Sequence, residues 1–119
     1  MPKKIFFENE LNDAWREARE KGIEYGIALG HKEGTQENDR KGMLYVACEM
    51  QDLGCMDPSD IDVSVFNRWR GYAMSDENRR GKAITESGFK KRKEALIVLL
   101  KALDLVAPLK VVQQHRSDI

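Results

Sequence analysis

Four stretches of the chain place apolar residues at the three- and four-residue spacing of an α-helix. They cover about residues 9–33, 37–53, 58–73 and 86–106, and short loops separate them. Their apolar positions are, in order, Leu11, Trp15, Ala18, Gly22, Tyr25 and Leu29; Met43, Val46, Ala47, Met50 and Leu53; Ile61, Val65, Phe66, Trp69 and Ala73; and Leu96, Leu99, Leu100, Leu103 and Val106. Such spacing gives each helix one apolar face. The pattern therefore predicts an all-α single domain, residues 1–119, of four main helices.

Residues that favour helix ends support these bounds. Asp57 can cap the third helix. Gly54 stands just past the second helix, where a left-handed backbone is common. Thr85 or Ser87 can cap the last helix, and Pro108 follows its expected end.

Two short terminal segments have a different pattern. Lys3–Phe7 and Leu109–Val112 alternate in polarity or are β-branched, which is typical of strands. We therefore expect possible short terminal strands beside the helices.

Composition narrows the class of protein. The chain has 119 residues, of which 41% are hydrophobic and 34% charged, as in one globular domain. Its longest apolar run, Ala95–Leu100, is far shorter than the ~20 residues that span a bilayer. The N-terminus has no apolar core of signal-peptide length. These features predict a cytoplasmic protein with no membrane partner.

Residues that could carry catalysis or bind metal are few. Cys48 and Cys55 are expected to be reduced, and Cys48 is interpreted as a small buried thiol in an apolar segment. His31 and His115 are remote from both cysteines in sequence, so no metal site is expected. The chain has no phosphate-binding loop or dinucleotide fingerprint. We expect no cofactor and no enzymatic activity.

Glycine recurs at every fourth position in one stretch, at Gly22, Gly26, Gly30 and Gly34. Each glycine inside a helix costs about 1 kcal/mol relative to alanine, so a close approach by another backbone should offset that cost. The row drifts by about 40° per step, which limits the approach to a short crossing near Gly26. Another helix of this chain can fill the groove, a partner chain or second copy can fill it, or the helix can end near Gly30. If a partner fills it, the predicted protein interface is Gly22, Tyr25, Gly26 and Gly30.

The zero net charge divides into an acidic and a basic half. Residues 1–67 carry 14 acids and 8 bases, whereas residues 68–119 carry 6 acids and 12 bases. Residues 68–93 alone hold nine bases against three acids. The run Lys90–Lys93 lies at the expected start of the last helix, where the macrodipole disfavours cations and favours an anion. The predicted nucleic-acid-binding residues are Arg68, Arg70, Tyr72, Arg79, Arg80, Lys82, Lys90, Lys91, Arg92 and Lys93.

Two functions remain open at this stage. The first is a small non-enzymatic regulator or accessory protein that contacts nucleic acid through residues 68–93. The alternative is a protein-binding adaptor or inhibitor that uses the acidic half and the glycine groove, with an acidic or nucleic-acid-handling protein, or a second copy, as its partner. A third interpretation of the basic segment is that its bases pair with the acidic half of the same chain or form a solvated face.

Overall fold

All regular structure in the computed structural model, which describes residues 5–114, is helical. Five α-helices are present in this range, and no strand. The elements are η1 (Glu8–Glu10), α1 (Asp13–Ala28), α2 (Glu33–Asp52), η2 (Pro58–Asp60), α3 (Val63–Ala73), α4 (Glu86–Ala102) and α5 (Val106–Gln114). The predicted all-α class is confirmed, with one main helix more than the pattern indicated.

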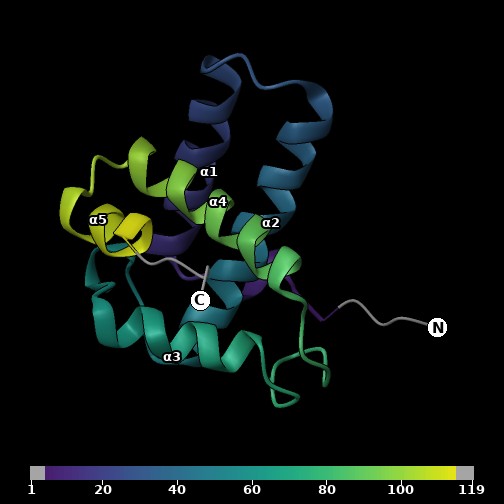
Figure 1. Ribbon diagram of the computed structural model, residues 1–119. Helices are drawn as coiled ribbons and strands as arrows, with labels where there is room; N and C mark the ends of the chain where they lie inside the picture. The colour runs from purple at the N-terminus through teal and green to yellow at the C-terminus, as the bar shows by residue number, and fades with distance from the viewer. Residues whose placement is uncertain (1–4, 115–119) are drawn as a thin grey trace.

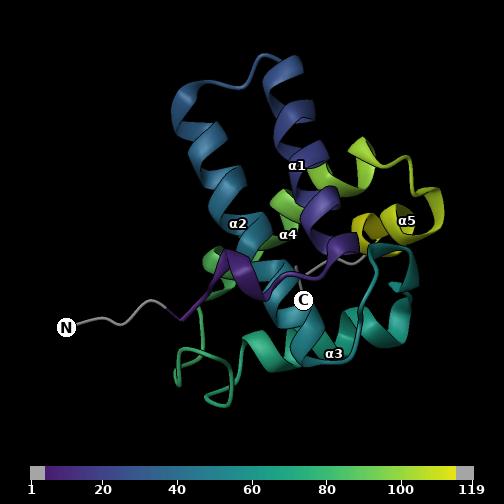
Figure 2. The same ribbon diagram turned by 180° about the vertical axis from the view of Figure 1, so that it is seen from behind.

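Helices α1 and α2 form an antiparallel hairpin, and α4 lies across one face of it (Figure 1). The reverse view shows the N-terminal segment running along the opposite side of α2 (Figure 2). Helix α3 closes the end of the hairpin remote from its tip, and α5 packs on the C-terminal half of α4. The loop between α3 and α4 lies next to the N-terminal segment, which Arg79 of the loop bonds at Ile5.

Aromatic side chains fill the centre of the molecule. Trp15 and Trp69 are fully buried, and Trp69 packs against Phe66 and Phe89 with ring centroids 5.7 and 4.7 Å away. The indole N–H of Trp15 donates to the carbonyl of Cys55 at 2.9 Å, so this buried donor is satisfied. The prediction that Trp69 belongs to the core is confirmed, as is that of a buried Cys48 thiol.

The third predicted helix begins later than expected. Asp57 does cap a turn by accepting the N–H of Ser59 at 2.8 Å, but that turn is the short η2. The chain is extended at Ile61, and Asp62 then caps α3 by accepting the N–H of Val65 at 2.8 Å. A second capping residue five positions after the first restarts the helix, because its carboxylate satisfies a new set of free N–H groups.

The C-terminal predictions need a larger correction. The last predicted helix ends at Ala102, after which Asp104 adopts a left-handed φ of 55°. Leu109–Val112, predicted as a strand, lies inside α5, whose first turn contains Pro108. Proline is tolerated there because its missing N–H has no intrahelical partner to bond. Pro108 and Val112, one turn apart, are both buried, so packing outweighs the β-propensity of the segment.

The remaining bounds shift by a few residues. Helix α1 begins at Asp13, behind an Asn12 cap that accepts the N–H of Trp15 at 2.9 Å. Thr85 caps α4 as predicted, and Gly54 follows α2 with a φ of 87°. Of the predicted strand Lys3–Phe7, residues 5–7 are not in a strand, and residues 3 and 4 lie outside the described range.

The glycine series divides between three environments. A Cβ added to Gly22 would lie 2.8 Å from the sulfur of Met43 on α2 and 3.2 Å from the Cα of Leu99 on α4. One added to Gly26 would lie 3.0 Å from the carboxylate of Asp39. Gly30 ends the helix with a φ of 84°, and Gly34 is exposed in α2. Other parts of this chain therefore fill the space at the first two glycines, and the helix ends at the third.

No helix within residues 5–114 combines the length and apolar character needed to cross a membrane.

Candidate nucleic-acid interface

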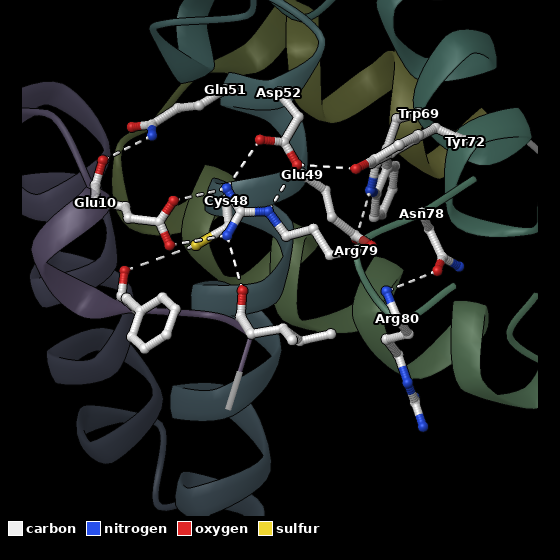
Figure 3. Close-up of polar contacts among 12 residues, drawn as sticks. Glu10, Cys48, Glu49, Gln51, Asp52, Trp69, Tyr72, Asn78, Arg79 and Arg80 are labelled. Carbon is white, nitrogen blue, oxygen red and sulfur yellow. Dashed lines mark hydrogen bonds and ion pairs between the residues drawn. The ribbon is translucent and has the colours of Figure 1, made fainter. Parts of the chain in front are cut away.

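Some cations of the basic segment 68–93 are held by contacts within the protein, and others line a cavity without an ion pair. Arg79 is the centre of the first set (Figure 3). Its guanidinium donates to both carboxylate oxygens of Asp52, at 2.7 and 2.8 Å, and to both of Glu10, at 2.9 and 3.0 Å. A further N–H donates to the carbonyl of Ile5 at 2.9 Å. Arg79 therefore joins the loop before α4 to the end of α2 and to the N-terminal segment.

The charges of this cluster reinforce one another. Hydrogen bonds from Arg79 hold the pKa of Glu10 below its usual range. Burial alone would raise the pKa of Asp52, but hydrogen bonds from Arg79 and Tyr72 and the guanidinium charge lower it overall. Burial and the hydrogen bond that its hydroxyl donates to Asp52, at 2.9 Å, raise the pKa of Tyr72 to about 12. Tyr72, one of the predicted nucleic-acid-binding residues, is thus bonded within this cluster.

Arg92 forms a second internal pair. It donates to Glu49 at 2.6 Å, and the indole N–H of Trp69 donates to the other oxygen of that carboxylate at 3.1 Å. Glu49 has no exposed surface and Arg92 is 6% exposed. Burial raises the pKa of Glu49 despite the attraction of Arg92. The pair connects α2 to α4 within the core.

Two further arginines of the segment also contact the protein. Arg68 donates to the carbonyl of Leu53 at 2.8 Å and so satisfies a free group at the end of α2. Arg70 lies 3.4 Å from the carboxylate of Glu86. Of the predicted binding residues, Arg68, Arg70, Tyr72, Arg79 and Arg92 are therefore held by internal contacts. Pairing of the basic segment with the acidic half occurs for Arg79 and Arg92.

The other cations lie around a cavity of about 670 Å³ between α2, α4 and the loop that precedes α4. Arg80 and Lys82 come from the loop, Lys91 from the second turn of α4 and Lys41 from α2. Arg80, Lys82 and Lys91 form no ion pair within residues 5–114, and Lys41 has only a 3.8 Å contact with Glu37. We call this hollow, lined by these four cations and Tyr45, the cationic groove.

The loop is fixed in place by one buried amide. Asn78 is 5% exposed, and its side chain donates to the carbonyls of Ala73 and Lys82 at 2.7 and 2.9 Å. Its oxygen accepts the backbone N–H of Arg80 at 2.9 Å. Arg79 and Arg80 consequently point in different directions, the first into the internal cluster and the second away from it (Figure 3). Adjacent arginines thus serve different purposes.

Two acidic residues also line the cationic groove and reduce its positive charge, but they are fewer than its cations. Asp39 is one acidic lining residue, and its carboxylate oxygen lies 2.9 Å from the Nδ1 atom of His31. Glu94 is the second acidic lining residue. The N-terminus of α4 also opens there, with the N–H of Gly88 bonded to Thr85 at 3.0 Å and the positive end of the helix dipole directed outward. The balance favours an anionic ligand.

A second cavity of about 470 Å³ adjoins the first and shares Lys41, Tyr45, Arg80 and Arg92 with it. Ile5, Phe6 and Leu44 give it an apolar wall, and Arg19, Arg40, Glu8 and Glu37 complete its polar lining. Sequence reasoning missed Lys41 and Tyr45, because both belong to the acidic half. Their spacing of four in α2 was the available signal that they share one face.

The remaining predicted residues have other surroundings. Lys90 is exposed on α4 without lining either cavity, and Lys93 is half-buried. Gly22 and Gly26 are buried, whereas Tyr25 is half-buried and Gly30 exposed. Their role as a protein interface stays a prediction. His115 lies outside the described residues.

Within residues 5–114 no three histidine, cysteine or acidic side chains gather as a metal site would require. Comparison with models of known protein families, with curated proteins and with solved structures finds no match.

Proposed function

We propose that this protein is a small non-enzymatic regulator or accessory factor that binds nucleic acid through the cationic groove. One observation carries the proposal: Arg80, Lys82 and Lys91 converge on one cavity and have no acidic partner in the described chain. Cations gathered without direct ion pairs, and outnumbering the two acidic lining residues Asp39 and Glu94, repel one another, and a ligand phosphate relieves that repulsion. The proposal moves the binding surface from the whole segment 68–93 to its groove-facing part, extended by Lys41 of the acidic half.

Charge removal tests the proposal. The triple variant Arg80→Gln, Lys82→Gln and Lys91→Gln removes three positive charges from the groove without touching the internal ion pairs. Binding of a fluorescent oligonucleotide is measured by anisotropy as salt is raised from about 50 mM, where phosphate contacts are strong. Three lost contacts should weaken binding and reduce the slope of log affinity against log salt by about 2.

The matched control removes the same charge elsewhere. Lys21, Lys101 and Lys110 are exposed and line neither cavity, so their replacement by glutamine gives an equal change in net charge. The control should keep most of the affinity. An equal loss of affinity in both triple variants would show that only net charge matters and would refute binding in the groove. Undetectable binding by the unaltered protein at about 50 mM salt would refute the proposal as well.

The alternative function, a protein-binding adaptor, is supported by exposed apolar residues and not by the glycine series. Ile27 and Leu29, at the tip of the α1–α2 hairpin, are 48% and 55% exposed and adjoin Gly30. Apolar side chains gathered at a tip favour contact with another protein or a second copy. Sedimentation equilibrium of the unaltered protein and of Leu29→Glu tests self-association: a dimer that the substitution converts to monomer supports it. If both proteins are monomers, the hypothesis of a homo-oligomer is refuted.

A further inference from the structure

Arg80, Lys82 and Lys91 line a hollow rather than a projecting element. We infer that the cationic groove binds single-stranded nucleic acid in preference to duplex, an inference that rests on the function proposed above. The structural basis is the way that α2, α4 and the preceding loop surround the cavity, together with a tyrosine, Tyr45, that lines it and whose hydroxyl forms no hydrogen bond within residues 5–114.

The floor of the groove is a close helix crossing. Gly42 of α2 lines the cavity, and a Cβ built on it would lie only 2.7 Å from the Cβ of Ala95 on α4. Arg92, almost fully buried, also lines it. Arg80 and Lys82 stand on the loop side and Lys91 on the α4 side. The positive charges therefore surround a depression whose bottom reaches the packed core.

A duplex is poorly suited to such a depression. Proteins that read double-stranded DNA insert a helix or a β-ribbon into its grooves, so their binding element projects. Here α4 and the part of α2 from Asp39 onward pack into the core, and hydrogen bonds from Asn78 hold the loop in place. A single strand is narrower and flexible, and positively charged grooves that follow its backbone are the common way to bind it.

The two cavities offer different chemistry to such a strand. The first presents the unpaired cations and suits phosphates. The second shares Arg80 with the first, but its other arginines are engaged within the protein: Arg19, for example, donates to the carbonyl of Arg40 at 3.0 Å and lies 3.6 Å from Glu8. Its apolar wall, which includes Phe6 and Leu44, suits a base or sugar. A strand that crosses Tyr45 would meet phosphate contacts on one side and apolar contacts on the other.

Tyr45 stands at the junction of the two cavities. Its ring packs against Phe6, with centroids 4.4 Å apart, and lies 5.1 Å from the guanidinium carbon of Arg92. The ring is therefore held in position, yet its hydroxyl forms no hydrogen bond within residues 5–114. A fixed donor beside unpaired cations is well placed to bond a phosphate oxygen of the strand.

Competition between strands tests the inference. The full-length protein is titrated with a labelled single strand of about 12 nucleotides, with its duplex and with free mononucleotide, because single-strand sites span about 4–16 nucleotides. Binding of the strand about tenfold or more tighter than both competitors supports the inference. Equal or tighter duplex binding overturns it while leaving the proposed function standing, and tighter mononucleotide binding shows a nucleotide site instead. Absence of binding by all three refutes both proposals.

A hydroxyl deletion tests the placement of the strand. Tyr45→Phe keeps the ring contacts with Phe6 and Arg92 and removes only the donor, so single-strand affinity should fall about fivefold or more. Tyr25→Phe, on a half-buried tyrosine of α1 that lines neither cavity, is the matched control and should bind nucleic acid as the unaltered protein does. Unchanged affinity of Tyr45→Phe would remove Tyr45 from the site, and equal losses in both variants would do the same.

Discussion

Gly42 and Ala95 set how closely α2 and α4 approach. The 2.7 Å separation between a Cβ built on Gly42 and the Cβ of Ala95 is far inside the ~3.5–4.0 Å of an ordinary carbon–carbon contact. Gly42→Ala must therefore push the helices apart, and overpacking of this kind costs about 1–3 kcal/mol. Removing a glycine from a helix returns about 1 kcal/mol. The expected net loss in the free energy of unfolding is about 1 kcal/mol, taking the middle of both ranges.

Exchanging the two residues should undo the damage. Ala95→Gly alone loses about 1 kcal/mol of helix propensity and about 0.8 kcal/mol from a buried methyl group, so it costs about 2 kcal/mol. In the double variant Gly42→Ala/Ala95→Gly, the propensity changes cancel and one methyl group again occupies the crossing. Its stability should lie within about 1 kcal/mol of the unaltered protein, against a sum of single losses of about 3 kcal/mol.

Urea unfolding followed by helical circular dichroism measures these differences, with an unchanged dependence on denaturant as the check for two-state behaviour. Gly71→Ala is the matched control: Gly71 is exposed in α3 with no atom near its added Cβ, so that variant should gain about 0.5–1 kcal/mol. A Gly42→Ala protein as stable as the unaltered one would refute the close crossing. A double variant as unstable as the sum of its parts would show that the two sites do not share one space.

Three further predictions concern the buried contacts. Gly22→Ala should lose about 1 kcal/mol in urea unfolding, because the added methyl group meets a methionine side chain and the backbone of α4; a gain would contradict this. Arg79→Gln should lower stability at neutral pH. Arg79 lowers the pKa of Glu10 and of Asp52, so its stabilising effect is present above the pKa values that these carboxyls have in the unfolded chain. The effect is lost as the pH falls through their pKa values in the folded protein. The difference in the free energy of unfolding between the variant and the unaltered protein should therefore shrink when both are measured at acidic pH. Arg92→Met should cost about 3 kcal/mol at pH 7 by leaving Glu49 buried and unpaired. The raised pKa of that carboxyl means that stability is lost as pH rises through it, so the deficit should grow with pH and be reduced by adding Glu49→Gln.

Local signals predicted much of the fold. The Thr85 cap, the left-handed Gly54 and the core position of Trp69 each follow from a few neighbouring residues. The failures occurred where two local signals competed. A second cap at Asp62 restarted a helix, and burial of Val112 outweighed the β-propensity of its segment. The spacing of residues along the chain does not show which of two competing signals prevails, because tertiary packing determines the outcome.

The buried ion pair was visible in part. Arg92 follows Phe89 by three positions and precedes Leu96 by four, which places it on the apolar face of α4. Glu49 likewise stands three after Val46 on the core face of α2. Opposite charges at core positions of two helices predict a pair, since buried charges are almost always paired.

Arg79 gave no comparable signal. It lies in an irregular loop without periodicity, and its partners Asp52 and Glu10 are 27 and 69 positions away. The distinction between Arg79 and Arg80 depends on the backbone around Asn78, which composition cannot reveal. The groove was equally hidden, because Lys41 and Tyr45 come from the half of the chain whose net charge is acidic.

The contacts of Arg79 have a consequence for local unfolding. A single guanidinium bonds the N-terminal segment at Ile5 and Glu10 and also anchors its own loop to Asp52. Release of Arg79 would remove one anchor from each segment at once, although about seventy residues of chain separate them; Asn78 would still hold the loop. Backbone amides of the two segments should therefore exchange with solvent deuterium at coupled rates, as members of one cooperative opening unit. Because Arg80 and Lys82 belong to that loop, the same opening would also move two of the cations that line the cationic groove.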